Sequence, residues 1–283
     1  MRRAIALSAH GLGTASPNPP VGCVILNRQG RLVGEGYHQK KGDAHAEGNA
    51  LRAAGASARG ATAVVTLEPC NHVGRAPACR ELLINAGVSR VVVALIDPTS
   101  RGSGGVAELR KAGVEVETGV LAEEAGVVLG PWLTALRTGT PAVTWTYLVS
   151  GSNSDEIPHL DRVRRGYDAV LFPDGRFEEG IRGGHGTDTF ALPPHAVDLG
   201  SADLLKSLYA GGVRSLLLAG RSNPLMERLA AAGLIDEIFA YLPDNGPSSG
   251  AAEDWTLIPI DFKVIEIHRV QDHVRVRALR RQA

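Results

Sequence analysis

The strongest constraint in this sequence is one histidine and two cysteines arranged as a set of metal ligands. His45 comes first, Cys70 follows within the same third of the chain, and Cys79 lies shortly after it. An imidazole and two thiolates suit zinc, and three protein ligands leave one tetrahedral position for water. The sequence therefore predicts one catalytic zinc ion, Zn2+, and a fold that brings these three side chains together.

A carboxylate two residues after the histidine completes the pattern. Glu47 stands in the run His45-Ala46-Glu47, and the order His-x-Glu, Pro-Cys, Cys is typical of zinc-dependent deaminases. In such a site zinc lowers the pKa of its water toward neutrality. We expect Glu47 to be the catalytic proton carrier and not a ligand: it takes a proton from water, returns one to the ring nitrogen and helps expel ammonia.

The spacing of the cysteines predicts a loop between them. Eight residues separate Cys70 from Cys79. At about 100° per residue, positions nine apart face opposite sides of one helix, so a single helix cannot present both sulfurs. Cys79 would begin a helix over residues 80–86, whose N-terminus stabilises a thiolate. The loop would carry His72 and Arg75 to the substrate's side of the metal.

Strands and helices alternate along the whole chain, which predicts an α/β protein. In the first part, helices are expected at 2–11, 45–54, 80–86, 104–112 and 123–138, and strands at 21–26, 32–37, 63–67, 90–96 and 114–120. In the second part, strands are expected at 143–149, 167–172, 215–219, 238–242, 262–269 and 273–279, and helices at 201–210 and 224–232. A Gly-Thr-Pro linker places the boundary between domains 1–140 and 141–283.

Several segments resemble the riboflavin-biosynthesis pyrimidine deaminases, nearly without interruption from about residue 4 to residue 120. They are Pro17-Asn18-Pro19-Pro20-Val21-Gly22, Gly34-Glu35-Gly36-Tyr37-His38, Gly42-Asp43-Ala44-His45-Ala46-Glu47 and Thr66-Leu67-Glu68-Pro69-Cys70 with the following residues through Cys79. The resemblance implies a cytidine-deaminase-like α/β/α sandwich with five strands and both metal helices on one side. It also implies deamination of a 2,5-diamino-6-phosphoribosylamino-pyrimidinone, with release of ammonia.

The same resemblance assigns four residues to the substrate. Asn18 has an amide able to read a pyrimidine edge, and His38 and His72 flank the metal segments. Arg75 could pair with a phosphate through its planar guanidinium. One departure concerns the substrate's arm: the run Asp97-Pro98-Thr99-Ser100 lacks the asparagine that the family usually has at position 99, which helps to hold the ribose-phosphate.

The family usually carries a second, dihydrofolate-reductase-like half that reduces the ribose with NADPH. Here the run 145–151 lacks the lysine of that half. Pro173-Asp174-Gly175 replaces a glycine-rich cofactor turn, and Ala219-Gly220-Arg221 stands where Glu-Gly-Gly is expected. We therefore predict a degenerate, catalytically inactive reductase-like domain with no cofactor-binding residues, retained for structure or for homodimer assembly.

Composition narrows the other possibilities. Lys and Arg number 30 and so do Asp and Glu, so the formal net charge of zero gives no electrostatic footprint for nucleic acid. Of the three cysteines only Cys23 is left outside the predicted metal site, so no disulfide framework is expected and a reducing cytoplasm fits. No apolar run is long enough for a membrane span. The expected partner is a small aminopyrimidine.

Four other interpretations stay open. One is a bifunctional deaminase and NADPH reductase with an altered second site, and another is a deaminase of a different amino-heterocycle in a specialised pathway. An RNA-editing deaminase is disfavoured by the neutral charge and by the long loop between the cysteines. An inactive zinc scaffold is disfavoured because a structural site would not need Glu47.

Overall fold

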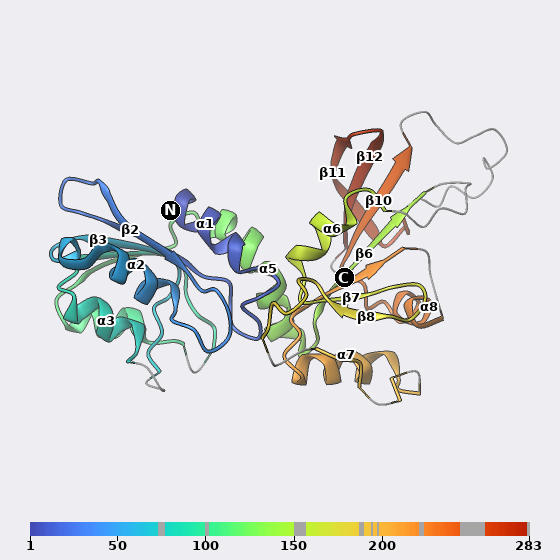
Figure 1. The fold of residues 1–283 in the computed structure, drawn as a ribbon, viewed down its shortest axis with the longest axis horizontal. Coiled ribbons are helices and arrows are strands. Elements are labelled where there is room, and N and C mark those ends of the chain that lie inside the picture. Colours follow the sequence, from blue (N-terminus) through green and yellow to red (C-terminus); the bar gives the residue numbers. More distant parts are fainter. Residues whose placement is uncertain are drawn as a thin grey trace. The chain divides into compact units, whose positions relative to one another are not determined.

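The chain forms two compact units, Met1–Gly130 and Pro131–Ala283 (Figure 1). This computed structural model describes residues 1–72, 77–99, 102–149, 157–186, 190–193, 195–196, 198–220, 224–243 and 258–281. The division falls within helix α5 (Ala122–Thr138), ten residues before the linker at which the sequence places the domain boundary.

The first unit is built on a five-stranded sheet of order β2-β1-β3-β4-β5. Strand β1 pairs antiparallel with β2 and β3, while β3, β4 and β5 run parallel. Its elements are α1 (Arg2–Ser8), β1 (Gly22–Leu26), β2 (Leu32–Tyr37), α2 (Ala46–Ala54), β3 (Thr62–Leu67), α3 (Cys79–Asn85), β4 (Arg90–Leu95), α4 (Gly105–Lys111) and β5 (Glu115–Thr118). Short 3-10 turns lie at Ala9–Gly11 and Gly55–Ala58.

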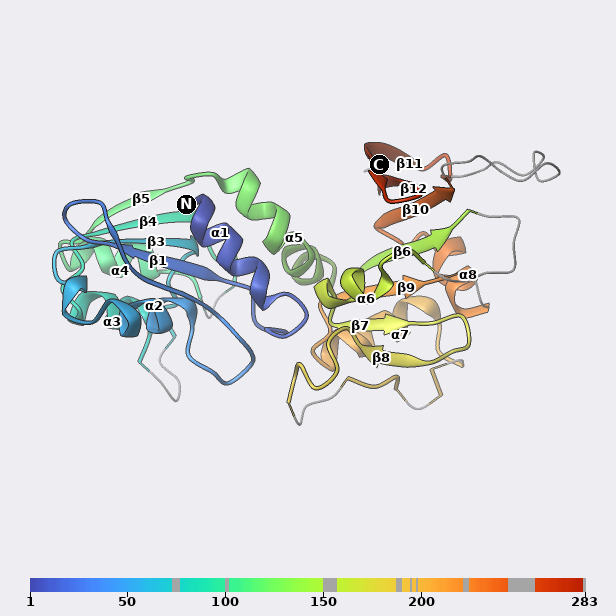
Figure 2. The same ribbon diagram turned by 45° about the horizontal axis from the view of Figure 1, so that its top comes forward.

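Helices cover both faces of this sheet, with α1 on one face and α2, α3 and α4 on the other (Figure 2). Glycines in strands β1 and β2 allow the helices to pack close to the sheet. A Cβ on Gly22 would lie 2.1 Å from the Ala4 carbonyl oxygen of α1, and a Cβ on Gly36 would lie 2.6 Å from the Ala50 nitrogen of α2. Since such separations are impossible for real side chains, both contacts depend on glycine. Helices α2 and α3 also contact each other, on the same side of the sheet.

The second unit has a seven-stranded sheet of order β11-β12-β10-β6-β9-β7-β8, in which β10, β6, β9 and β7 are parallel. Its elements are β6 (Ala142–Leu148), α6 (Leu160–Val163), a 3-10 turn (Arg164–Gly166), β7 (Ala169–Leu171), β8 (Phe177–Glu179), α7 (Ser201–Ala210), β9 (Ser215–Ala219), α8 (Pro224–Ala231), β10 (Glu237–Pro243), β11 (Phe262–Val270) and β12 (His273–Arg280).

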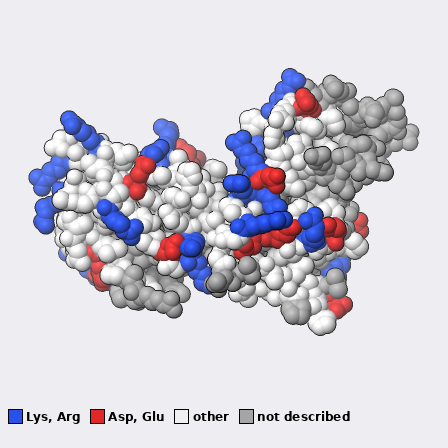
Figure 3. All heavy atoms as spheres, viewed as in Figure 1, with Lys and Arg blue, Asp and Glu red and all other residues white. Residues whose placement is uncertain are grey.

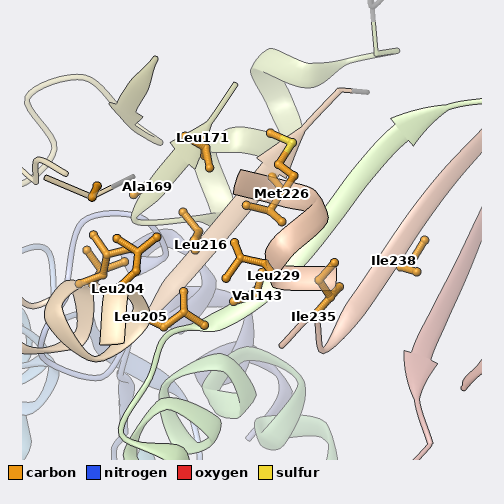
Figure 4. Close-up of a cluster of buried hydrophobic side chains, with 14 of the residues drawn as sticks. Val143, Ala169, Leu171, Leu204, Leu205, Leu216, Met226, Leu229, Ile235 and Ile238 are labelled. Carbon is orange, nitrogen blue, oxygen red and sulfur yellow. The ribbon is translucent and has the colours of Figure 1, made fainter. Parts of the chain in front are cut away.

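A buried apolar cluster joins this sheet to α7 and α8 (Figure 4). Leu216 of β9, Leu204 of α7 and Met226 of α8 are all at most 1% exposed. Burying a leucine side chain contributes about 1.5–3 kcal/mol, so this cluster contributes substantially to the unit's stability. Helix α6 and strand β8 were not predicted from the sequence, because elements of four and three residues are too short to show periodicity.

Candidate metal centre

The structure brings the three predicted metal ligands together from three different elements. His45 immediately precedes α2, Cys70 follows β3, and Cys79 is the first residue of α3. The His45 Nδ1 atom lies 3.2 Å from the Cys79 Sγ atom and 3.6 Å from the Cys70 Sγ atom. The candidate ligand atoms lie within 4.8 Å of one another, and no other such group occurs in the described part of the chain. One imidazole and two sulfurs at this spacing fit Zn2+.

The surroundings of the two cysteines favour a negative charge on sulfur, which would attract a cation. The backbone N–H of Cys79, at the start of α3, donates a hydrogen bond to the Cys70 Sγ at 3.3 Å. The Cys79 thiol, and after it the His45 ring, lower the pKa of Cys70 to about 4. The same shared hydrogen bond, together with burial, raises the pKa of Cys79, because one proton is held between the two sulfurs. Cys70 is therefore a thiolate at neutral pH.

One side of the ligand set is open. Cys79 is buried and Cys70 is half-buried, whereas His45 is exposed. Solvent therefore reaches the ligand set from the His45 side, and three protein ligands would leave one position of a tetrahedral zinc site for water. This is the arrangement of a catalytic site, since structural zinc sites use four protein ligands.

Glu47 lies in the first turn of α2 and is only 3% exposed. Burial raises the pKa of its carboxyl group to about 7. The Cys79 thiol forms a hydrogen bond with this carboxyl group, which places Glu47 directly beside the ligand set. A carboxyl group whose pKa lies near neutrality can both accept and donate a proton, as general acid–base catalysis requires.

Asn18 and His38 form a pair behind the metal ligands. The Asn18 Nδ2 lies 3.1 Å from the His38 Nε2, and the His38 Nδ1 lies 3.3 Å from the Ala44 carbonyl oxygen. His38 is 2% exposed, and its ring packs edge-on against the His45 ring at 5.1 Å. Both ring nitrogens of His38 thus have protein partners, and the pair is tied to the segment that carries His45.

The other two predicted substrate residues belong to the loop between the cysteines. His72 is exposed and lies two residues after Cys70. Arg75 lies outside the described residues. Asn71, between Cys70 and His72, accepts a hydrogen bond from the Arg80 side chain of α3, which fixes the start of this loop against the helix that Cys79 begins.

Sequence analysis assigned no role to Glu68, which lies two residues before Cys70 and binds the segment that follows β4. Its Oε1 accepts hydrogen bonds from the Gly104 N–H at 3.1 Å and the Val106 N–H at 2.8 Å, and its Oε2 accepts one from the Asp97 N–H at 3.3 Å. The Glu68 carboxylate thereby joins the end of β3 to the loop after β4. The available signal was a charged residue between the buried strand β3 and Cys70.

Comparisons of sequence match the first unit. Residues 1–95 match the model of the cytidine and deoxycytidylate deaminase zinc-binding region. The diaminohydroxyphosphoribosylamino-pyrimidine deaminase of Buchnera aphidicola subsp. Schizaphis graminum is 46% identical over 142 residues, which cover 50% of this chain and 96% of that protein. The riboflavin biosynthesis protein RibD of Escherichia coli is 49% identical over 144 residues, but only 39% of its length is covered.

A solved structure matches both units. The diaminohydroxyphosphoribosylaminopyrimidine deaminase/5-amino-6-(5-phosphoribosylamino)uracil reductase of Thermotoga maritima is similar with a TM-score of 0.78 and 27% identity, covering 99% of this chain and 97% of that chain. The predicted fold class is confirmed: a cytidine-deaminase-like sandwich is followed by a reductase-like α/β domain. The similarity in sequence to the curated relatives above is confined to about half of this chain.

Proposed function

Because the chain belongs to the diaminohydroxyphosphoribosylamino-pyrimidine deaminase family, we propose that it is a zinc-dependent hydrolase that releases ammonia from an aminopyrimidine. The substrate would be of the 2,5-diamino-6-phosphoribosylamino-pyrimidinone type, as in riboflavin biosynthesis. The observation that carries this proposal is the convergence of His45, Cys70 and Cys79 beside the buried carboxyl group of Glu47.

Each group has a defined task in this proposal. Zinc held by His45, Cys70 and Cys79 would make hydroxide available at neutral pH by lowering the pKa of water. Glu47 accepts the proton that the attacking water loses and delivers it to the ring nitrogen next to the carbon under attack. It then takes the proton of the hydroxyl group now bonded to the ring carbon and passes it to the amino group, so that the C–N bond breaks, ammonia leaves and a carbonyl forms. Its raised pKa suits this work, because the carboxyl group can hold the proton between the two steps.

Asn18 would read the pyrimidine edge, and His38 would set the orientation of its amide. With the His38 Nδ1–H donating to the Ala44 carbonyl, the Nε2 atom must accept a hydrogen bond, and the Asn18 NH2 group supplies it. Asn18 is then left with its Oδ1 atom and one N–H for the substrate. His72 and Arg75 would contact the substrate from the loop, Arg75 through a phosphate.

Incubation with the phosphoribosylamino-pyrimidine, followed by measurement of ammonia release, tests the proposed activity. The control is Glu47→Gln, which keeps the metal ligands and removes the proton carrier. Ammonia release by the wild type, and its loss in this variant, is expected. A zinc-loaded protein that releases no ammonia from any aminopyrimidine tested would refute the proposal.

A second candidate substrate is an amino-heterocycle without the phosphoribosyl arm. Thr99 occupies the position at which the family resemblance implies an arm-binding asparagine. Its hydroxyl accepts the Gly102 N–H at 3.1 Å and its own N–H donates to the Asp97 Oδ1 at 2.7 Å. These polar groups of Thr99 therefore already have partners within the loop and are less available to a phosphoribosyl arm. Comparing kcat/KM for substrates with and without the arm separates the two candidates.

We further infer a homodimer that forms through the second unit. In the described part of its sheet β11 is an edge strand, and Ile265 and Ile267 on it are 44% and 64% exposed. Exposed apolar edge strands are templates for pairing with another chain. Antiparallel pairing with a second copy, with Ile267 opposite its own counterpart, would also place Glu266 opposite His268. Light scattering would show a dimer that Ile267→Lys dissociates, whereas a monomeric wild type would contradict the inference.

The expected surroundings are the reducing cytoplasm, since the proposed ligands Cys70 and Cys79 must stay reduced to hold zinc. None of the helices in the described residues combines the length and apolar character needed to cross a bilayer. On the face drawn in Figure 3, acidic residues lie among basic ones rather than apart from them, which favours a small substrate over a nucleic acid.

A further inference from the structure

We propose that the second unit does not bind a nicotinamide dinucleotide, so that the deaminated product must be released to a separate reductase. The fold similarity to a deaminase/reductase structure makes such a cofactor the natural expectation for this unit. The described residues at the edge of the sheet where it would bind do not fit it. The absence of cofactor binding goes beyond the proposed function, whereas the release of a deaminated product rests on it.

A dinucleotide would bind at the carboxyl edge of the parallel strands β6, β9 and β7. In open α/β sheets, ligands bind in the crevice outside the carboxyl ends of the strands. A dinucleotide carries a pyrophosphate, which proteins hold with free backbone N–H groups that glycines allow it to approach. The relevant turns here begin at Pro173, after β7, and at Gly220, after β9.

Gly220 is enclosed on three sides. Its N–H donates to the Thr146 carbonyl oxygen at 2.8 Å, and its own carbonyl oxygen accepts the Trp145 Nε1–H at 3.0 Å. The ring of Pro173 covers the glycine, because a Cβ on Gly220 would lie only 2.6 Å from the Pro173 Cγ atom. The space that a phosphate would need above this glycine is therefore filled by a side chain.

In the turn after β7, most backbone positions likewise have no N–H to offer an anion. Pro173 has no N–H, the Phe172 N–H donates to the Arg176 carbonyl at 2.9 Å, and the Gly175 N–H donates to the Phe172 carbonyl at 3.0 Å. The Arg176 N–H donates to the Asp174 Oδ1, also at 3.0 Å. These bonds close a tight hairpin between β7 and β8 and occupy the N–H groups of Phe172, Gly175 and Arg176.

The charges at this turn are also unfavourable for phosphate. The carboxylate of Asp174 would repel it. Arg176 is already paired with Asp174 at 2.5 Å and with Glu178 at 2.9 Å, and its guanidinium packs over the Phe172 ring at 4.5 Å. The Thr146 Oγ1 atom is buried without a hydrogen-bond partner, but its side chain is wholly inaccessible and one hydroxyl cannot neutralise a pyrophosphate.

The closed hairpin is anchored from behind, so it does not act as a movable flap. Arg164 donates to the Glu178 carboxylate at 2.8 Å and to the Glu179 carbonyl at 2.7 Å. The Asp168 Oδ2 accepts the Arg214 N–H at 2.8 Å and the Ser215 N–H at 2.9 Å. Since these partners hold both β7 and β8, opening the turn would break several buried hydrogen bonds.

The test is a titration of the full-length, zinc-loaded protein with NADPH. Calorimetry should give no measurable binding, corresponding to a Kd of about 1 mM or weaker. Amide hydrogen exchange supplies a second readout: Gly220 and Gly175 should exchange slowly, and NADPH should leave their rates unchanged. A known NADPH-dependent reductase in the same buffer checks the assay.

Turnover is followed in parallel with the aminopyrimidine and NADPH present. The expected result is ammonia release without oxidation of NADPH, so a failure of the proposed deamination would be seen separately. Arg221 follows Gly220 but lies outside the described residues, so Arg221→Ala is titrated beside the wild type. Micromolar binding of NADPH to the wild type would overturn the proposal, and its loss in Arg221→Ala would attribute that binding to this side chain.

Discussion

The two sheets of this protein present very different carboxyl edges. At the first, His45, Cys70 and Cys79 converge with their ligand atoms within 4.8 Å, and His45 is open to solvent. At the second, the N–H and carbonyl of Gly220 both have protein partners and a proline ring covers its Cα. The difference shows that the carboxyl edge of a sheet can bind a ligand only where the turns leave polar groups available to it.

The buried carboxylates show the same contrast. Glu47 in the first unit lies beside the candidate ligands, and burial raises its pKa to about 7. In the second unit Asp168 accepts two backbone N–H groups, and Glu179 accepts the Gly183 N–H at 2.7 Å and contacts the His185 ring at 3.1 Å. The first carboxyl group is positioned to exchange a proton, and the others stabilise the hairpin.

The largest effect should come from removing a metal ligand. Cys79→Ser is expected to lose zinc and all measurable deamination, because a hydroxyl is a far poorer zinc ligand than a thiolate. Metal analysis of the purified variant, beside the ammonia assay, measures both. Cys23→Ala is the matched control, since Cys23 is buried in β1 and should leave one zinc per chain. Full zinc occupancy in Cys79→Ser would remove Cys79 from the site.

Glu47→Gln should have the next largest effect. The amide keeps the shape of the carboxyl group but cannot carry the proton, so kcat should fall by about 10²–10⁴. Zinc content and the thermal unfolding curve should match the wild type, which separates catalysis from folding. Turnover near the wild-type rate would show that another group moves the proton. Glu47 would then not differ in catalytic role from the buried carboxylates of the second unit.

Asn18→Ala should have an intermediate effect. Losing hydrogen bonds to the substrate edge costs about 1–3 kcal/mol, or roughly ten- to a hundredfold in kcat/KM. His38→Phe should reproduce part of this loss with Asn18 still present, because the Asn18 amide would lose its orienting acceptor. If kcat/KM is unchanged in both variants, this pair has no part in substrate recognition.

The smallest effect on activity is expected from Asp168→Ala in the second unit. The buried N–H of Ser215 and the partly buried N–H of Arg214 lose their acceptor, which should cost about 1–3 kcal/mol of stability for the buried group and less for the other. Denaturant unfolding measures this loss. Zinc content and kcat should stay unchanged under conditions where the protein is folded. A large fall in ammonia release by the folded variant would show that the second unit supports the deaminase site.

Several features of the site could be predicted because they are local in the sequence. The helix starts at His45 and Cys79 follow from turn and periodicity signals, and the structure places α2 and α3 at residues 46–54 and 79–85. Ligand chemistry depends only on residue type, so zinc could be inferred from one histidine and two cysteines. Strand β8 was not predicted because its three residues are too few to show an alternating pattern.

The sequence by itself thus determined the α/β class and pointed to the candidate ligand set and the candidate proton carrier, since each depends on residue types and short spacings. Only the tertiary structure decided what each turn has left to offer a ligand. Glu68 reaches backbone amides 36 and 38 residues away, and Pro173 covers Gly220 from a different strand. Whether a buried amide or carboxylate has a partner is a property of long-range packing, which no local pattern records.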